Sequence, residues 1–461
     1  MLHLDNSIHI ATGMPVSPTP KTETKQSAIA NNTPSLDNNT QKIPAWAYRG
    51  VAFMGNKDVV IKVGTTNVAQ YSEMGKKAVE DVNSRAGKAG QFLNWINVLP
   101  NNQIKNLDAI YSLATQAKEG KYSDIAILGI GGSRHTTEAM MKLLGKDANV
   151  HFYSSVDPES FKRFASTLNL DKTKFLVVSK SGGTLETTVA YENAKKLMQQ
   201  HLGKEDVSDR FVAMTDASSE KSALRRIVNS GEIKLSGLVH DDVGGRFSIL
   251  DDATIFTLAY AGVPKEDVKK MLEASLAAQK EFSNPDINEN SALQLAAFNV
   301  EAKKAGKTKH FVEYFGDAFT GTTLWEKQLK NESLKAAIST DTNIGPGYLH
   351  YNAEADLDPN NKDSFFTFVY AKPEDKVTSA VLEGVVSAYS AQHPVSKIEL
   401  KDFSPESIAR FFELKHFETL YTGNMLRQLN NNVTPKTEAL PEVLQPNVEI
   451  YKKEVKKAMQ K

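Results

Sequence analysis

The stretch "KFLVVSKSGGTLETTVAYENAKKLMQQ", residues 174–200, decides the fold class of this chain. A short apolar run, KFLVV, predicts a buried strand, and the part that begins at Leu185 predicts a helix. Between them, "SKSGGTLET" (179–187) supplies hydroxyl groups, a lysine and two glycines. Ligands of open α/β sheets bind beyond the carboxyl ends of the strands, so this loop is the first candidate site.

The same alternation of strand and helix surrounds this stretch. Short apolar runs recur from 124 onward with helical segments between them, and a sparser set follows further along the chain. Such alternation predicts βαβ units and parallel sheets that are buried on both faces. The runs are DIAILGI, VHFYSS, KFLVVS and RFVAMTD in the first set, and KHFVEYFG, SFFTFVYA and SKIELKDF in the second.

We therefore predict an α/β protein with two doubly wound parallel-sheet domains, at 100–285 and 286–430. Residues 1–44 include a stretch rich in Pro, Thr, Ser and Asn, which predicts a flexible or wrapping arm. Residues 45–99 are expected to be mainly helical. A loop and a C-terminal helix are expected at 431–461.

The composition restricts the classes of partner. The 55 Lys and Arg residues balance the 55 Asp and Glu residues of the 461-residue chain, which argues against nucleic-acid and anionic-membrane partners. The chain has no cysteine, so disulfides and thiol chemistry are excluded and a reducing compartment fits. We expect no signal peptide and no membrane span, since no basic stretch precedes an apolar core and no apolar run is long enough.

The loop 179–187 has two interpretations. The N–H groups and dipole at the start of a helix attract anions, Ser179, Ser181 and Thr184 can add hydroxyl donors, and the glycines permit close approach, so the loop predicts a phosphate site. The alternative is an ordinary capped turn with Thr184 as N-cap and Glu186 in the first helical turn. The spacing of a Walker loop is missing.

A second turn of this kind lies upstream, in "ILGIGGSRHTTEAM", where Ser133 follows three glycines. A dinucleotide site is the alternative there, but only Asp157 is available as an acidic partner for a ribose. Two adjacent strand ends with Ser/Gly turns fit a small phosphosugar better.

Arg246 and Glu332 are candidates for catalysis. Arg246 lies between a glycine pair and an apolar stretch, where an unpaired charge is unfavourable, so the alternative is a structural arginine paired with a nearby aspartate (Asp241, Asp242 or Asp251). Glu332 prolongs an apolar helical stripe with Trp325 and Leu329, and a partly desolvated carboxylate suits a general base. The alternative is a helix-end glutamate that bends away to solvent.

His350 and Lys452 are weaker candidates. His350 follows a Gly-Pro-Gly turn, and most isolated histidines lie on the surface or serve in packing. Lys452 borders the apolar stripe of a C-terminal amphipathic helix, so it is the lysine there expected to face protein or ligand, while Lys453 points further round. The alternative is a lysine whose stem covers apolar surface while its amine reaches water.

Together these segments resemble the phosphoglucose isomerase (glucose-6-phosphate isomerase) family. DVGGRFSILDDATIFTLAYAG resembles the arginine signature of that family, and LQPNVEIYKK resembles its C-terminal signature. LGIGGS, VVSKSGGTLET and LWEKQLKNES occur in the family's order, and the match runs from about 45 to 455. The resemblance implies two sugar-isomerase (SIS) α/β domains, a homodimer with composite active sites and a cytoplasmic enzyme of glycolysis and gluconeogenesis.

The implied reaction is the reversible isomerisation of glucose 6-phosphate and fructose 6-phosphate, with no metal and no organic cofactor. By resemblance, Glu332 moves the proton between C1 and C2, Arg246 stabilises the enediolate, and His350 assists ring opening from the neighbouring subunit. Gln445 and Lys452 contact the substrate, with Lys452 near the ring oxygen.

The resemblance also assigns the phosphate contacts. Ser179, Ser181 and Thr184 would hold the phosphate, with Lys180 and Ser133 beside it. These contacts position the substrate rather than take part in the chemistry.

Several motifs depart from the family pattern. RHTT follows GGS, VLQPN replaces FDQxG, and the usual ESxGK is ESLKA, so the Glu-Ser pair is kept while its glycine is lost. His350 is assigned mainly by order and spacing. An isomerase that also accepts mannose 6-phosphate, and a non-catalytic SIS phosphosugar sensor, are the alternative functions. A sensor needs the loop 179–187 but not Arg246, Glu332, His350 and Lys452 together.

Overall fold

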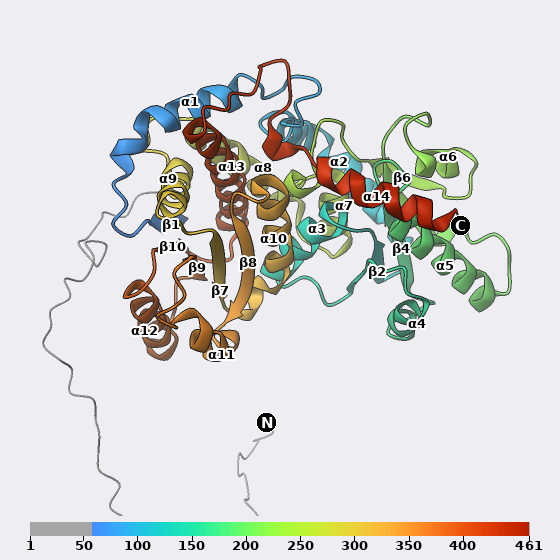
Figure 1. Cartoon of the computed structure of the whole chain (residues 1–461). Coiled ribbons are helices and arrows are strands. Elements are labelled where there is room, and N and C mark those ends of the chain that lie inside the picture. The colour runs from blue at the N-terminus through green and yellow to red at the C-terminus, as the bar shows by residue number, and fades with distance from the viewer. Residues whose placement is uncertain (1–57, 461) are drawn as a thin grey trace, which may run out of the picture. The chain divides into compact units, whose positions relative to one another are not determined.

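The computed structural model describes residues 58–460, whose elements are labelled in Figure 1. The first of two five-stranded sheets has the order β3-β2-β4-β5-β6, and all its neighbouring strands are parallel. The order reverses between β2 and β4, which is where doubly wound sheets form their ligand crevice. The strands are β2 (Asp124–Leu128), β3 (Val150–Tyr153), β4 (Thr173–Val178), β5 (Phe211–Thr215) and β6 (Leu235–Leu238).

The second sheet repeats this topology. Its order is β1-β10-β9-β7-β8, with β7 to β10 parallel and β1 antiparallel to β10. The order reverses between β7 and β9. The α/β prediction with two parallel-stranded sheets is therefore confirmed. The strands are β1 (Val59–Lys62), β7 (Lys309–Phe315), β8 (Ser339–Gly345), β9 (Ser364–Ala371) and β10 (Val395–Leu400).

Three strands were not predicted from the sequence. The β8 segment, STDTNIG, and the β6 segment, LSGL, contain no continuous apolar run, and β1, VVIK, has only a short one. All three are edge strands, each paired with one neighbour: β8 with β7, β6 with β5 and β1 with β10. The β1 strand also lies within the region that was predicted to be mainly helical.

Helices cover both faces of the first sheet, and β4 shows why. Its alternate residues belong to different apolar clusters, with Phe175 and Val177 on one face and Leu176 and Val178 on the other. The helices on the first face are α4 (Pro158–Ser166), α5 (Leu185–Leu202) and α6 (Ala223–Asn229). The cluster of the second face includes α2 (Val98–Lys118), α3 (Gly132–Leu143) and α7 (Asp252–Tyr260).

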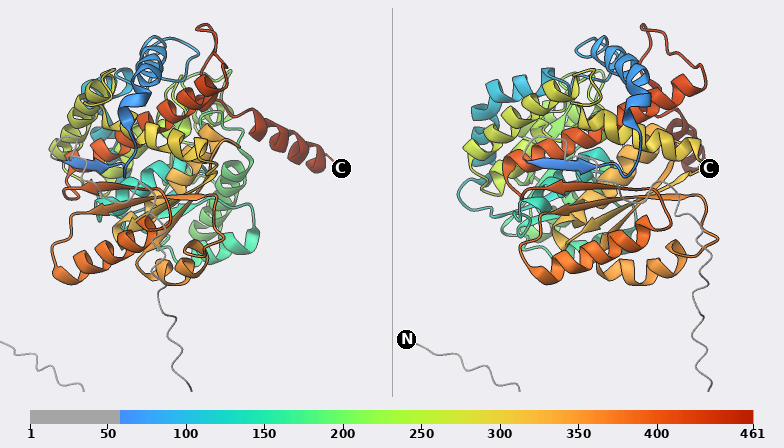
Figure 2. Two further views of the ribbon diagram at one scale, coloured as in Figure 1. Left: turned by 60° about the vertical axis from the view of Figure 1, so that its left-hand side comes forward. Right: turned by 90° about the vertical axis from the view of Figure 1, so that its left-hand side faces the viewer.

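The second sheet is covered in the same way, as the right-hand view of Figure 2 shows. One face packs against α11 and α12, whose Leu349 and Leu382 join Phe366 of β9 in a separate cluster. The opposite face meets α13 and the helices around it. The bounds are α8 (Lys265–Phe282), α9 (Ser291–Lys304), α10 (Thr320–Leu334), α11 (Gly347–Asp356), α12 (Lys376–Ser390) and α13 (Pro405–Leu429).

Helix α13 is the central helix of the described chain, and every residue in 407–426 is buried. It contacts α10 through buried charges. The Lys415 amine lies 2.5 Å from Glu326 of α10, and Glu418 pairs with Lys330 of the same helix. Removing one partner of such a pair is strongly destabilising, because a buried charge is left without compensation. The pairs therefore fix the position of α10, which carries Glu332.

The chain ends are less buried. Helix α1 (Ser72–Asn83) packs on α13, whereas α14 (Pro446–Met459) has no buried residue and extends outward in the left-hand view of Figure 2. No helix within 58–460 is long and apolar enough to cross a membrane. The predicted arm, 1–44, lies outside the described residues, and the domain boundaries at 285 and 430 stay predictions.

Candidate active site

The loop 179–187 leaves the carboxyl end of β4 and enters α5. The Ser179 hydroxyl accepts a hydrogen bond from the Gly182 amide (3.0 Å), and the Ser181 hydroxyl accepts one from the Gly183 amide (3.2 Å). Gly182 has φ +63°, and a Cβ there would stand 2.1 Å from the Leu224 amide nitrogen. The turn therefore requires glycine at 182, both for its conformation and for its packing.

The start of α5 leaves polar groups available to a ligand. Thr184 occupies the predicted N-cap position, but its side chain accepts no capping hydrogen bond, and its hydroxyl lies 3.5 Å from that of Ser179. The dipole of an 18-residue helix and the N–H groups of its first turn point to the same place. The Lys180 amine lies 3.3 Å from a carboxylate oxygen of Asp241. This geometry fits an anion site better than a turn capped by Thr184.

The turn 129–133 lies beside this loop, at the end of β2. A Cβ on Gly129 would stand 3.2 Å both from the Cβ of Ser133 and from the carbonyl oxygen of Val178. Ser133 therefore adjoins the residue that precedes the phosphate loop. Asp157, the acid considered for a ribose, is used as the N-cap of α4 and accepts from the Ser160 amide (2.8 Å). That use weakens the dinucleotide alternative.

The same turn contacts two further segments. A Cβ on Gly132 would stand 2.1 Å from the carbonyl of Gly245, in the 3₁₀ turn η3 (Gly245–Phe247), and one on Gly131 would stand 2.9 Å from the Gln328 amide nitrogen on α10. The turn 129–133 thus adjoins the phosphate loop, the arginine segment and the glutamate helix. It brings together three motifs that are far apart in the sequence.

Arg246 is fully buried and points at the carboxylate of Glu332. Its Nη1 donates to Glu332 Oε2 (2.8 Å), its Nε donates to the Ser333 hydroxyl (2.9 Å), and its Nη2 donates to the carbonyl of Glu442. Burial lowers the pKa of Arg246, and the negative charge of Glu332 opposes that shift. A permanent positive charge is therefore held at the carboxylate in a place that excludes water.

The alternative in which Arg246 pairs with a neighbouring aspartate is wrong. Asp241 binds two lysines, Lys180 and Lys221, and Asp251 serves as the N-cap of α7. The guanidinium instead reaches a helix 86 residues further along the chain. Sequence proximity suggested the aspartates, and only the tertiary packing of α10 supplies the observed partner.

Three donors hold the Glu332 carboxylate, so the alternative of a glutamate that bends away to solvent is also wrong. Its Oε2 accepts from Arg246 and from the Gln445 amide, and its Oε1 accepts from Gln328 (3.0 Å). The side chain keeps 23% exposure, which leaves it open to a ligand. Gln328 was not predicted as a site residue. Its position four residues before Glu332 in one helix nevertheless indicates that the two side chains are neighbours.

Gln445 contacts Glu332 from a segment 113 residues further along the chain. It follows the 3₁₀ turn η5 (Pro441–Val443) and precedes α14. The Glu442 carbonyl in this turn accepts from Arg246, so the backbone of the segment is bound to the same cluster. The predicted site residues Arg246, Glu332 and Gln445 therefore form one connected group.

His350 and Lys452 do not join this group. His350 is exposed on α11. Lys452 is exposed on α14, where its amine pairs with Glu449 at 2.7 Å. Among residues 58–460, no hydrogen bond or ion pair connects either residue to Glu332. Their predicted roles stay predictions.

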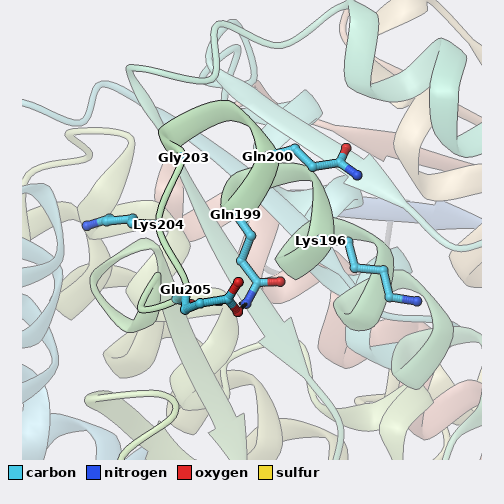
Figure 3. A pocket seen from close by; sticks show the side chains of 6 residues that line it. All are labelled: Lys196, Gln199, Gln200, Gly203, Lys204 and Glu205. Atoms are coloured by element: carbon cyan, nitrogen blue, oxygen red, sulfur yellow. Dashed lines mark hydrogen bonds between the residues drawn. The ribbon is translucent and has the colours of Figure 1, made fainter.

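A shallow pocket elsewhere on the surface is separate from the site. It lies at the C-terminal end of α5, whose N-terminal end receives the phosphate loop (Figure 3). Its first lining residue, Lys196, lies 11 residues after Leu185, the first residue of α5, which is about 17 Å along the helix. The residues around this pocket are Lys196, Gln199, Gln200, Gly203, Lys204 and Glu205.

Comparisons with known proteins point to the same family that the motifs resemble. A family model described as phosphoglucose isomerase matches residues 95–351. A glucose-6-phosphate isomerase of Exiguobacterium sibiricum is 26% identical over 437 residues, which cover 85% of this chain and 92% of the relative. One of Acetivibrio thermocellus is 27% identical over 289 residues, and that match covers 59% of this chain and only 62% of the relative.

Two solved structures have the same fold. A hypothetical protein of Thermus thermophilus, TT0462, aligns with a TM-score of 0.73 at 21% identity over 85% of this chain and 96% of its own. A glucose-6-phosphate isomerase of Chlamydia trachomatis aligns with a TM-score of 0.73 at 15% identity over 88% and 89%. At such identities the likeness establishes the fold alone.

Proposed function

This chain belongs to the phosphoglucose isomerase family, and we propose that it interconverts glucose 6-phosphate and fructose 6-phosphate. The observation that carries the proposal is the Glu332 carboxylate. It is ionically paired with the buried Arg246 at 2.8 Å, within a group that adjoins the phosphate loop through the turn 129–133. An aldose–ketose isomerisation of a sugar phosphate needs three elements: a base, a fixed positive charge and a phosphate-binding site.

The mechanism uses Glu332 as the base and Arg246 as the electrostatic stabiliser. The Glu332 carboxylate removes the proton from C2 of the open-chain aldose, which leaves a cis-enediolate. The guanidinium of Arg246 compensates the negative charge that develops on the oxygens. A proton passes from the O2 hydroxyl to O1 of the enediolate, and Glu332 then returns the proton taken from C2 to C1, which completes the ketose. A preorganised positive group in a water-poor site stabilises such a transition state without further rearrangement.

The phosphate group anchors the substrate at the two strand ends. Ser179, Ser181 and Thr184 contact it, with Lys180 and Ser133 beside them. Binding energy from this remote group aligns C1 and C2 with the base.

The remaining predicted residues act around the sugar. Gln445 contacts the substrate next to Glu332, and Lys452 lies near the ring oxygen. His350 assists ring opening, and we propose that it comes from a second copy of the chain. The exposed positions of His350 and Lys452 in the single chain support a composite site in a homodimer. The large apolar side chains that α14 exposes, Ile450, Tyr451 and Met459, support it as well.

A coupled assay with purified protein and EDTA tests the activity. We expect turnover of glucose 6-phosphate and fructose 6-phosphate, because the mechanism uses protein side chains only. Folded protein that binds the phosphosugar without turning it over would favour the sensor alternative. Comparable turnover of mannose 6-phosphate would favour the enzyme with two aldose substrates. The reaction belongs to glycolysis and gluconeogenesis, and we place the protein in the cytoplasm.

Mixing two inactive variants tests the composite site. His350→Ala and Glu332→Gln chains that are expressed together form mixed dimers, in which one of the two sites would contain both intact residues. We expect the mixed sample to recover activity well above the residual activity of either pure variant. If His350 served its own chain, the mixture would recover nothing.

A further inference from the structure

Lys335 has a backbone conformation that lysine rarely adopts. It follows the last residue of α10, three residues beyond Glu332, with φ 53° and ψ −131°. Glycine enters this region readily, whereas a Cβ makes it unfavourable. The position is also the one at which the family motif ESxGK has glycine. A side chain that remains at an unfavourable position suggests that the side chain has a use.

The Lys335 amine binds the segment that delivers Gln445. Its Nζ donates to the Pro441 carbonyl at 2.6 Å, and Pro441 is the first residue of η5. We refer to residues 441–445 as the strap. At its other end, the Gln445 amide donates to the Glu332 carboxylate. One cation therefore connects the end of the helix that carries the base to the start of the segment that orients the base.

Two arginines bind the middle of the strap. Arg246 donates to the Glu442 carbonyl, and Arg427 pairs with the Glu442 carboxylate. Three cations thus converge on one short segment. Burial, together with the charges of Arg246 and Arg427, lowers the pKa of Lys335, while Glu332 opposes that shift. A lysine amine is unfavourable in such surroundings unless it has a fixed acceptor, which the Pro441 carbonyl supplies.

We propose that Lys335 is a positioning residue for the isomerase reaction, because its amine holds the strap so that Gln445 keeps the Glu332 carboxylate aimed at the two reacting carbons. Lys335 does not touch the substrate in this role. The inference rests on the proposed isomerase function. It adds a residue that the family resemblance does not assign, at a position where the family has glycine.

Three substitutions of Lys335 distinguish the effect of its amine from the effect of its unfavourable backbone conformation. Lys335→Met keeps a Cβ and removes the amine, Lys335→Gly removes both, and Lys335→Arg keeps the charge. We expect kcat for glucose 6-phosphate to fall about tenfold in Lys335→Met and Lys335→Gly, because a displaced base loses near-attack geometry. KM should stay within about twofold, because the phosphate loop is elsewhere, and Lys335→Arg should recover most of kcat.

A matched control lies on the same helix. Lys327 is exposed and pairs with Asp341 at 2.8 Å, so Lys327→Met should leave kcat and KM unchanged. Hydrogen exchange gives a readout that does not depend on activity. Amides of the strap should exchange faster in Lys335→Met than in the unaltered protein, whereas those of α13 should not change.

The pH profile distinguishes positioning from simple structural support. The unaltered enzyme should lose kcat at alkaline pH as the Lys335 amine loses its proton, and Lys335→Arg should shift that loss to higher pH, because arginine stays charged. Full kcat in Lys335→Met, or kcat restored by Lys335→Gly, overturns the proposal, since the amine then has no role. If the unaltered protein has no isomerase activity, the proposed function fails instead.

Discussion

The backbones of Gly132 and Gly245 are in direct contact, although one lies at the start of α3 and the other in the arginine segment. A Cβ on Gly132 would stand 2.1 Å from the Gly245 carbonyl. This contact fixes the residue that precedes Arg246 against the turn that adjoins the phosphate loop. The distance between the phosphate loop and Arg246 therefore depends on Gly132 and Gly245, which have no side chains.

Gly132→Ala should push the arginine segment away from the turn that adjoins the phosphate loop. The added methyl group has no space, so we expect a loss of about 1–3 kcal/mol in the free energy of unfolding, as in overpacked cores. A shift of about 1 Å at Arg246 would lower kcat roughly a hundredfold. Urea unfolding and the coupled assay measure the two effects. Gly384→Ala, in open space inside α12, should leave kcat unchanged and raise the free energy of unfolding by about 0.5–1 kcal/mol, because alanine is the better helix former. Equal behaviour of the two variants would show that the contact between Gly132 and Gly245 does not position Arg246.

Glu332→Gln should abolish proton transfer while substrate binding persists. The amide keeps the shape and accepts a hydrogen bond from Arg246, but it has no basic oxygen. We expect kcat to fall by about 10²–10⁴, the usual contribution of a general base, while calorimetry with glucose 6-phosphate still detects binding. Glu273→Gln on the exposed surface of α8 is the control. Retention of full activity would mean that another residue is the base.

Arg246→Lys should impair catalysis even though the positive charge is kept. The guanidinium donates simultaneously to Glu332, to Ser333 and to the Glu442 carbonyl, a pattern that an ammonium on a shorter, non-planar group cannot reproduce. We expect kcat to fall by about 10²–10³, as when an oxyanion donor is removed. The measurement is kcat and KM together, and a change confined to KM would contradict a role in stabilising the enediolate.

Asp251→Asn should change how stability depends on pH. Burial raises the pKa of Asp251 from 3.8 to about 7, and Asp252 adds to the shift while His240 opposes it. A raised carboxyl pKa favours the protonated folded state, so this contribution is complete below pH 4 and is lost as the pH rises through 7. Asparagine does not titrate, so the variant lacks that loss. The difference in the free energy of unfolding between Asp251→Asn and the unaltered protein should therefore grow in favour of the variant by on the order of 2 kcal/mol from pH 5 to pH 8.

Urea unfolding at the two pH values measures this gain. Asp375→Asn provides the control, since Asp375 is also an N-cap but is exposed, and the amides that it accepts from lower its pKa. That variant should show no gain at pH 8. An Asp251→Asn effect that is equal at both pH values would show that the carboxyl group does not titrate in this range.

Lys452→Ala should reduce isomerase activity more than Lys453→Ala. The two lysines are adjacent on the exposed helix α14, so neither change should affect the thermal stability of a single chain. Only Lys452 is expected to reach the substrate in the assembled enzyme. Activity at protein concentrations above and below dimer dissociation, followed by sedimentation, is the measurement. Equal activity of the two variants would remove Lys452 from the site.

Much of the fold could be predicted because strands and helices have local signals. The apolar run before Ser179 and the helical spacing after Thr184 are properties of neighbouring residues, so they predict β4 and α5 directly. β8 could not be predicted in this way, since its polar residues become a strand only beside β7. The loop chemistry at 179–187 was likewise local, and it indicated an anion site before any contact was known.

The sequence by itself determined the two α/β halves, the Ser/Gly turns at the strand ends and the motif order that identifies the family, because each depends on residues close together in the chain. Only the tertiary structure decided that Arg246 pairs with Glu332, that Gln445 holds the same carboxylate and that Lys335 binds the strap. These contacts join segments separated by up to 113 residues, as for Gln445 and Glu332. The packing of α10 against α3 and α13 brings them together, and no local pattern specifies that packing.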